Sequence, residues 1–356
     1  MSEPGLNGVK QTVARFAQVG RTNQHLPEPA ARHDEGREAH PALPGAQHRT
    51  HRVVDARHGL RRPRAGLLST ALLPVLGQIA PRAPDQVPVE GTRTVELVGG
   101  RVRYQSTGTG ADALLCLHGF NSQLSIWNDV WPVLAECGRT VRLDLPGYGG
   151  SDWRSSSYSL PSQAERVIRF MDAVGLARAT LLGVSMGGSL AAWIAAHHPD
   201  RVKGLVLLAP SAYPGALQYR GLFGELFRPG PANRWATRIA STGLYRRLYP
   251  RSRALHALTV TASYGEPWAR ALERIRAHAW LLWSRGDTSV PFSYASAVAS
   301  AIPSSTLVPL SGSVGHNIPA LRPALIGKLA RRVHQGLPTE LILRELESVL
   351  RTQGDA

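Results

Sequence analysis

The sequence predicts an α/β fold in which helices cover both faces of a mostly parallel, twisted sheet. From Arg93 onward, short apolar runs alternate with amphipathic segments of helical length, and this alternation implies right-handed crossovers between parallel strands. Residues 179–198 pass from an apolar strand into a small-residue helix through a tight, glycine-rich turn. A chain of 356 residues is long enough for one large domain of this kind and additional segments.

Each element follows from its local pattern. Gly99-Gly100 separates the first two strand patterns and predicts a two-residue hairpin turn. Short apolar runs predict strands over residues 93–98, 102–106, 113–117, 140–145, 179–184, 202–208, 279–283 and 306–310. Helical spacing of apolar residues predicts helices over 126–136, 161–174, 188–198, 267–278 and 291–301, from Pro319 onward, and over 337–350. The sheet domain is therefore expected to comprise residues 86–210 and 263–356.

The first 85 residues differ from the rest in composition. Arg, Ala, Pro, His and Gly dominate, which predicts a disordered basic extension, or a segment that arises from a start codon placed too far upstream. Within it, residues 65–80 form a short apolar run interrupted by Pro74 and preceded by arginines. This run predicts a helix that docks on the core or associates loosely with a membrane. The alternative is a signal sequence over residues 61–83, read from a downstream start.

The net charge of +16 does not by itself indicate a nucleic-acid partner. Lysine occurs only at Lys10, Lys203 and Lys328, so the excess is arginine, as in proteins from GC-rich genomes, and no nucleic-acid-binding motif accompanies it. Cys116 and Cys137 lie in no metal-ligand spacing and are expected to be packing residues. We expect no metal, no organic cofactor and no nucleic acid.

The turn within residues 179–198 has the pattern G-x-S-x-G, from Gly183 to Gly187. A chain that changes from strand to helix within so few residues forces Ser185 into a strained conformation with its hydroxyl at the tip. The helix that follows directs free N–H groups and a positive dipole at the same point. The plainer interpretation is a glycine-rich strand–helix turn with no chemical role, so the surrounding sequence has to decide.

A serine nucleophile needs a base, and a histidine base needs an acid to orient it. Both partners are expected in loops at the carboxyl ends of later strands. Asp287 is the only carboxylate in the loop after the strand that ends near Trp283, and His316 is the only histidine in the loop after the strand that ends near Leu310. The chain order is thus Ser, Asp, His.

These residues resemble the α/β-hydrolase superfamily over about residues 93–335. The resemblance implies that Ser185 is the nucleophile, His316 the general base and then acid, and Asp287 the group that orients His316. It also implies an oxyanion hole built from backbone N–H groups of Phe120 and Met186. The segments that carry it are His118-Gly119-Phe120, the turn from Asp144 to Asp152, the turn Gly183–Gly188, and the loops of Asp287 and His316.

Residues 211–262 have aromatic residues but no strand pattern, and the resemblance implies a helical cap here over the active site. The only acid in this segment is Glu225. Its arginines are Arg220, Arg228, Arg234, Arg238, Arg246, Arg247, Arg251 and Arg253. One hypothesis is that the cap, or residues 65–80, makes weak contact with an anionic membrane surface or an acidic substrate. The alternative is a solvated basic face.

The predicted activity is hydrolysis of carboxylic esters through an acyl-enzyme. Ser185 argues against epoxide hydrolases and haloalkane dehalogenases, which have aspartate at this position. A C–C bond hydrolase or an acyltransferase of the same fold remains an alternative, and a non-catalytic ligand-binding protein a more distant one. The expected partner is a small ester or acyl substrate. We expect a cytoplasmic location with a possible membrane association, or secretion if residues 61–83 act as a signal.

Further polar residues receive structural interpretations. Asp144 and Asp152 flank a glycine-rich turn and are expected to stabilise it. His118 is expected to brace the loop of Phe120. The remaining predictions of this kind place His197 and His198 at a helix end, and Trp127 and Trp131 in the core.

Overall fold

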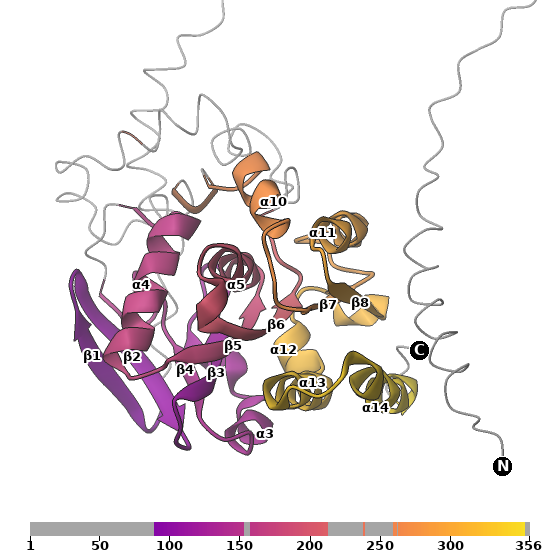
Figure 1. Ribbon diagram of the computed structural model, residues 1–356, viewed down its shortest axis with the longest axis horizontal. Helices are drawn as coiled ribbons and strands as arrows, with labels where there is room; N and C mark the ends of the chain where they lie inside the picture. Colours follow the sequence, from indigo (N-terminus) through magenta and orange to yellow (C-terminus); the bar gives the residue numbers. More distant parts are fainter. Residues whose placement is uncertain (1–88, 153–156, 213–237, 239–258, 262, 353–356) are drawn as a thin grey trace, which may run out of the picture.

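The computed structural model describes residues 89–152, 157–212, 238, 259–261 and 263–352. Within these ranges the chain forms one eight-stranded sheet between two layers of helices (Figure 1), which confirms the predicted α/β class. The strands are β1 (Thr92–Leu97), β2 (Gly100–Thr107), β3 (Asp112–Leu117), β4 (Thr140–Leu143), β5 (Arg178–Val184), β6 (Val202–Leu208), β7 (Ala279–Ser284) and β8 (Ser305–Leu310).

The strand order is β1-β2-β4-β3-β5-β6-β7-β8. The antiparallel pairings are β1 with β2 and β2 with β4, and every other neighbouring pair is parallel. Strands β4 to β8 therefore end at the same edge of the sheet, together with β3. Strand β3 lies between β4 and β5, so the chain passes to one side of β3 to form β4 and to the other side to form β5. In open parallel sheets such a position is where ligands bind.

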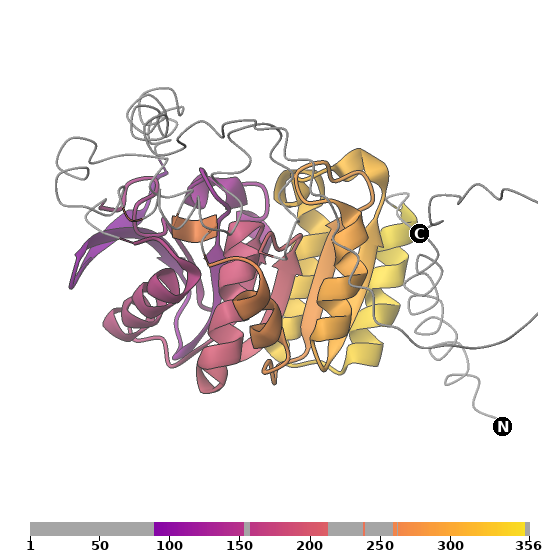
Figure 2. The same ribbon diagram turned by 90° about the horizontal axis from the view of Figure 1, so that it is seen from above.

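Helices lie alongside the strands on both faces (Figure 2). One layer contains α4 (Leu160–Ala173), α5 (Met186–His197), α10 (Glu266–Leu272) and α11 (Ala295–Ala301). The other contains α3 (Trp131–Ala135), α12 (Ile318–Leu321), α13 (Pro323–Gln335) and α14 (Thr339–Thr352). Short 3-10 turns complete the set: η2 (Leu124–Trp127), η3 (Pro199–Arg201), η4 (Phe292–Tyr294) and η5 (Gly312–Val314).

The core follows from strands that are apolar on both faces. From Ala113 to Leu117 every side chain of β3 is buried, and all of β7 is buried as well. Continuous apolar runs of this kind are typical of parallel strands with helices on both sides. Each fully buried leucine or aromatic side chain stabilises the fold by roughly 1.5–3 kcal/mol relative to exposure. The loops at the carboxyl edge of the sheet are consequently attached to strands that are packed on both faces.

Several predicted boundaries were wrong, among them that of the helix over 291–301, which is divided into η4 and α11. Leu97 pairs with Gly100, so the hairpin turn is Val98-Gly99 and not Gly99-Gly100. The helix predicted over 126–136 is divided into η2 and α3, because Pro132 has no N–H and fits only the first turn of a helix. The helix predicted over 267–278 ends at Leu272, after which the chain continues in turns before β7.

Several predictions concern residues outside the described ranges. The basic extension (1–85), its apolar run (65–80) and most of the cap segment (211–262) are among them, and they stay predictions. The first residues of the cap segment contact the residues that directly follow it: Gly265 N donates to Ala212 O at 3.0 Å, and the hydroxyls of Ser211 and Tyr264 lie 2.9 Å apart. No helix among the described residues combines the length and apolar character needed to span a membrane.

Candidate active site

Ser185 occupies the turn between β5 and α5 in a strained backbone conformation, with φ 53° and ψ −118°. Only Asn121 and Ala209 share a positive φ with it among the described non-glycine residues. The Ser185 N–H donates to Leu208 O at 2.8 Å, which holds the strained residue against β6. Such strain costs of order 1–3 kcal/mol and persists only where the surrounding structure enforces it.

The glycines of this turn are required by close approaches of backbone to backbone. A Cβ at Gly187 would overlap the carbonyl oxygen of Leu117, at the end of β3, and a Cβ at Gly183 would overlap the carbonyl of Gly187. Gly119 faces the serine, because a Cβ added there would lie 3.3 Å from the Ser185 Cβ. The loop after β3 and the turn after β5 therefore form one packed unit.

Asp287 and His316 are in direct contact. The His316 Nδ1 lies 2.7 Å from Asp287 Oδ2, and the other carboxylate oxygen accepts from the backbone N–H groups of Ser289 (2.9 Å) and Val290 (2.8 Å). The Asp287 side chain is fully buried, whereas that of His316 is 28% exposed. A carboxylate can only accept, so the ring proton belongs on Nδ1 and the Nε2 lone pair is available to take a proton.

The loops that hold this pair are fixed to each other by two hydrogen bonds to main-chain carbonyls and by a close approach of backbone to backbone. Arg285 N donates to Leu310 O at 3.0 Å, and the Ser284 hydroxyl donates to Ser311 O at 2.8 Å. Gly286 lies so close to Gly312 that a Cβ on it would overlap the Gly312 carbonyl oxygen. The distance between the Asp287 and His316 loops is thus set by the main chain.

The three predicted catalytic side chains follow β5, β7 and β8, at the same edge of the sheet. The structure brings Asp287 and His316 together. The hydrogen bond that would join Ser185 to His316 stays a prediction.

The two proposed oxyanion donors lie on the packed unit around Ser185. Met186 begins α5, and the first N–H groups of a helix have no intrahelical acceptor. Phe120 follows Gly119 in the loop after β3. That loop is held by His118, whose Nε2 accepts from Leu145 N at 3.0 Å, which leaves Nδ1 to donate to Gly119 O at 2.7 Å. The bracing expected of His118 is therefore present, and its tautomer is determined.

Asp144 stabilises both the turn that follows β4 and the loop that follows β3. It is fully buried, and its carboxylate accepts from Leu124 N, from Gly150 N (both 2.7 Å) and from the Arg103 guanidinium at 2.5 Å. Arg103 also donates to Gln123 Oε1 at 3.2 Å. Sequence reasoning missed the arginine, because β2 is a largely polar strand in which one more arginine does not indicate a buried partner.

Tyr148 is a second residue that sequence reasoning missed. It lies in the same turn and is fully buried. Its ring meets the rings of His118 and Phe120 edge-on, with centroids 5.3 and 6.1 Å apart, and its hydroxyl lies 3.4 Å from Met186 Sδ. An aromatic residue inside a glycine-rich turn is the only sequence signal that points to it.

The remaining residues singled out from the sequence lie in packing and hydrogen-bonding contacts away from the Asp287–His316 pair. His197 bonds to Trp193 O and stacks on the Trp193 ring, and His198 lies 3.4 Å from Glu165. Burial raises the pKa of the Cys116 thiol. Trp127 is buried. The core position predicted for Trp131 was wrong: it lies on α3 instead of η2, is partly exposed, and packs under the Arg142 guanidinium. Burial lowers the pKa of Arg142 to about 10.

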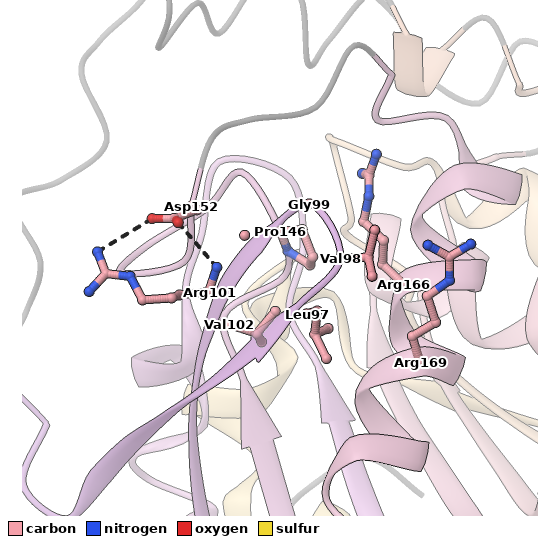
Figure 3. Close-up of a pocket in the computed structure, with 10 residues that line it drawn as sticks. Leu97, Val98, Gly99, Arg101, Val102, Pro146, Asp152, Arg166 and Arg169 are labelled. Carbon is pink, nitrogen blue, oxygen red and sulfur yellow. Dashed lines mark hydrogen bonds and ion pairs between the residues drawn. The ribbon is translucent and has the colours of Figure 1, made fainter.

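A hollow in the surface lies elsewhere, at the β1–β2 hairpin (Figure 3). Asp152, predicted to stabilise its turn, closes one side by accepting from Arg101 N at 3.1 Å. The hairpin is at the sheet edge remote from β7 and β8, so this hollow is separate from the Asp287–His316 pair. Its lining includes Val98, Arg101, Pro146, Asp152, Arg166 and Arg169.

In the described part of the chain, no three His, Cys, Asp or Glu side chains are grouped to hold a metal ion.

Comparisons with known proteins identify relatives over parts of the chain. An acetyltransferase component (dihydrolipoyllysine-residue) of the acetoin cleaving system of Cupriavidus necator is 40% identical over 119 residues, 33% of this chain and 32% of the relative. A pimeloyl-(acyl-carrier protein) methyl ester esterase of Edwardsiella ictaluri is 36% identical over 119 residues, 32% of this chain and 44% of the relative. The chain thus matches less than half the length of either protein. A 2-hydroxy-6-oxononadienedioate/2-hydroxy-6-oxononatrienedioate hydrolase of Burkholderia vietnamiensis is 30% identical over 219 residues, 54% of this chain and 76% of the relative.

Solved structures share the fold over most of the chain. A membrane phospholipase A is 24% identical, with a TM-score of 0.54, over 80% of this chain and 92% of that one. A hydrolase from Pseudomonas aeruginosa is 22% identical, with a TM-score of 0.55, over 70% of this chain and 100% of that one. The profile of the family described as alpha/beta hydrolase fold matches residues 112–278, which include the Ser185 turn. By its sequence profile, and by a relative that is 30% identical and matched over 76% of its length, the chain belongs to the α/β-hydrolase superfamily, and its fold agrees with this.

Proposed function

We propose that this protein is a serine hydrolase that cleaves carboxylic esters through an acyl-enzyme intermediate. The observation that carries the proposal is the combination, at one sheet edge, of the strained Ser185 with a hydrogen-bonded Asp287–His316 pair. Strain at a serine between strand and helix has no structural benefit that a glycine would not provide at lower cost. It is accounted for if the hydroxyl must project from the tip of the turn.

In the proposed mechanism, Ser185 Oγ attacks the ester carbonyl while His316 Nε2 accepts the hydroxyl proton. Asp287 holds the imidazole in the required tautomer and stabilises the positive charge that the ring acquires. The developing oxyanion accepts hydrogen bonds from the N–H groups of Phe120 and Met186. Removal of one such donor typically costs about 10²–10³-fold in kcat. His316 then protonates the leaving alcohol, and the same base activates the water that hydrolyses the acyl-enzyme.

Ester cleavage is favoured over two alternatives of the same fold. One relative is named as a methyl ester esterase, another as an oxononadienedioate hydrolase and a third as an acetyltransferase component. All three names are compatible with a Ser-His-Asp site, so the relatives alone do not choose among them. Ester hydrolysis needs only the groups proposed above together with water, whereas acyl transfer needs an acceptor site and C–C cleavage needs a site for a dienol acid.

The test is a series of p-nitrophenyl esters from acetate to palmitate, with wild type and Ser185→Ala compared. Turnover that disappears in the variant supports Ser185 as the nucleophile. The acyl-chain length that gives the highest rate indicates the size of the acyl pocket. A folded protein that turns over no ester but reacts with a fluorophosphonate at Ser185 would favour C–C cleavage or acyl transfer. A protein that does neither would be a binding protein.

A further inference from the structure

Tyr148 is the side chain that touches both loops of the proposed oxyanion hole. Its ring lies against Phe120 on the loop after β3, and its hydroxyl lies 3.4 Å from Met186 Sδ at the start of α5. The contact with the His118 ring, 5.3 Å between centroids, adds a second point on the β3 loop. No part of this tyrosine is exposed to solvent.

The turn that carries Tyr148 is itself held in place. Tyr148 N donates to Leu145 O at 2.9 Å, and Ser151 N donates back to Tyr148 O at 3.0 Å. Gln163, on α4, donates to Pro146 O at 2.9 Å. Because these hydrogen bonds fix the backbone of the turn, the Tyr148 side chain has a defined position against which the two loops pack.

We propose that Tyr148 is a positioning residue that sets the separation of the Phe120 and Met186 N–H groups. This inference rests on the proposed function. Two donors serve one oxyanion only if each lies about 2.7–3.1 Å from the place where the charge develops. The donors belong to segments 66 positions apart in the chain (120 and 186), so their spacing depends on how the two loops pack. The close backbone approaches at Gly119 and Gly187 bring the loops together, and side chains that contact both loops complete the packing. Tyr148 contributes to that packing because its ring contacts Phe120 and its hydroxyl contacts the Met186 side chain.

The experiment compares Tyr148→Phe and Tyr148→Leu with wild type, using p-nitrophenyl butyrate as substrate and butylboronic acid as a tetrahedral transition-state analogue. The phenylalanine variant keeps the ring contacts and loses only the hydroxyl at Met186. The leucine variant loses both. We expect kcat to fall about 3-fold for Phe and about 10–100-fold for Leu, with KM within about 3-fold of wild type. The inhibition constant of the boronate should rise in proportion to the loss of kcat/KM.

The control is Phe170→Leu, which removes an equally buried aromatic ring that packs on Tyr104 instead. It is expected to lower the melting temperature without changing kcat or boronate affinity. Equal kcat losses in Phe170→Leu and Tyr148→Leu, or a Tyr148→Leu effect confined to KM, would overturn the proposal. Should Tyr148→Leu fail to fold, Tyr148→Phe decides, and an unchanged kcat there overturns it. Failure of the proposed function itself would show separately, as wild type without esterase activity or Ser185→Ala with it.

Discussion

Asp287→Asn is the substitution whose consequence follows most directly from the hydrogen bonds. In the wild type, one carboxylate oxygen accepts from Ser289 N and Val290 N, and the other accepts from His316 Nδ1. The asparagine amide has one acceptor and one donor end. Two backbone donors keep its oxygen on their side, so its NH₂ group must face the histidine.

The consequence is a change of tautomer. A donor opposite Nδ1 forces that nitrogen to accept, and the ring proton moves to Nε2, which can then no longer take the proton of Ser185. In other Ser-His-Asp sites this change lowers kcat by about 10⁴-fold, or about 5.4 kcal/mol. We expect the same magnitude here. The fold should survive, because the two backbone hydrogen bonds remain and the net worth of the lost charged one is about 1.5–3 kcal/mol.

The assay is kcat/KM for the best p-nitrophenyl ester, with circular dichroism to verify folding. Asp112→Asn is the matched control, because Asp112 also forms ion pairs, with Arg178 and Lys203, but at the opposite end of the strands, at the start of β3. The control should retain wild-type activity. If Asp287→Asn stays within about 10-fold of wild type while folded, Asp287 does not orient the base, and the argument from the hydrogen bonds is refuted.

Three further predictions concern the same scaffold. Gly286→Ala should push the Asp287 and His316 loops apart, because the added Cβ would overlap Gly312. A displacement of about 1 Å should lower kcat about 100-fold in the same ester assay. An unchanged kcat would mean that the loops adapt to the added methyl group. Ser185→Gly should melt about 2–8 °C above Ser185→Ala, because glycine relieves the positive φ, while both are inactive; equal melting temperatures by calorimetry would contradict the strain argument. Burial lowers the pKa of His334, which bonds to Thr180, below 6.5. As the pH falls below 6.5, the unfolded chain binds more protons at this histidine than the folded chain does, so the free energy of unfolding that is present at higher pH decreases. Denaturant titrations should therefore show a smaller decrease in the free energy of unfolding between about pH 7 and 5 for His334→Gln than for wild type.

The parts of the fold that could be predicted are those that local sequence determines. Alternating apolar runs located every strand of the sheet, and the chain order of strands indicated which loops meet at the carboxyl edge. Asp287 and His316 could be singled out because each is the only residue of its type in such a loop. Helix boundaries were less certain, since Pro132 interrupts a pattern that spacing alone would continue. Contacts between distant turns have no local signature, and Tyr148 was therefore missed.

The Arg103–Asp144 pair shows why such contacts matter to the site. A buried ion pair contributes little net stability, and well-packed apolar residues could replace it without loss. Apolar residues could not, however, accept from Leu124 N, the bond that joins the β3 loop to the β4 turn, or from Gly150 N, the bond that closes the β4 turn itself. The charge of Asp144 strengthens both bonds, and Arg103 compensates that charge in a buried position. The pair is thus better explained by the positioning of the loops around Ser185 than by the stability of the fold, and a strained serine is tolerable only where loops are fixed in this way.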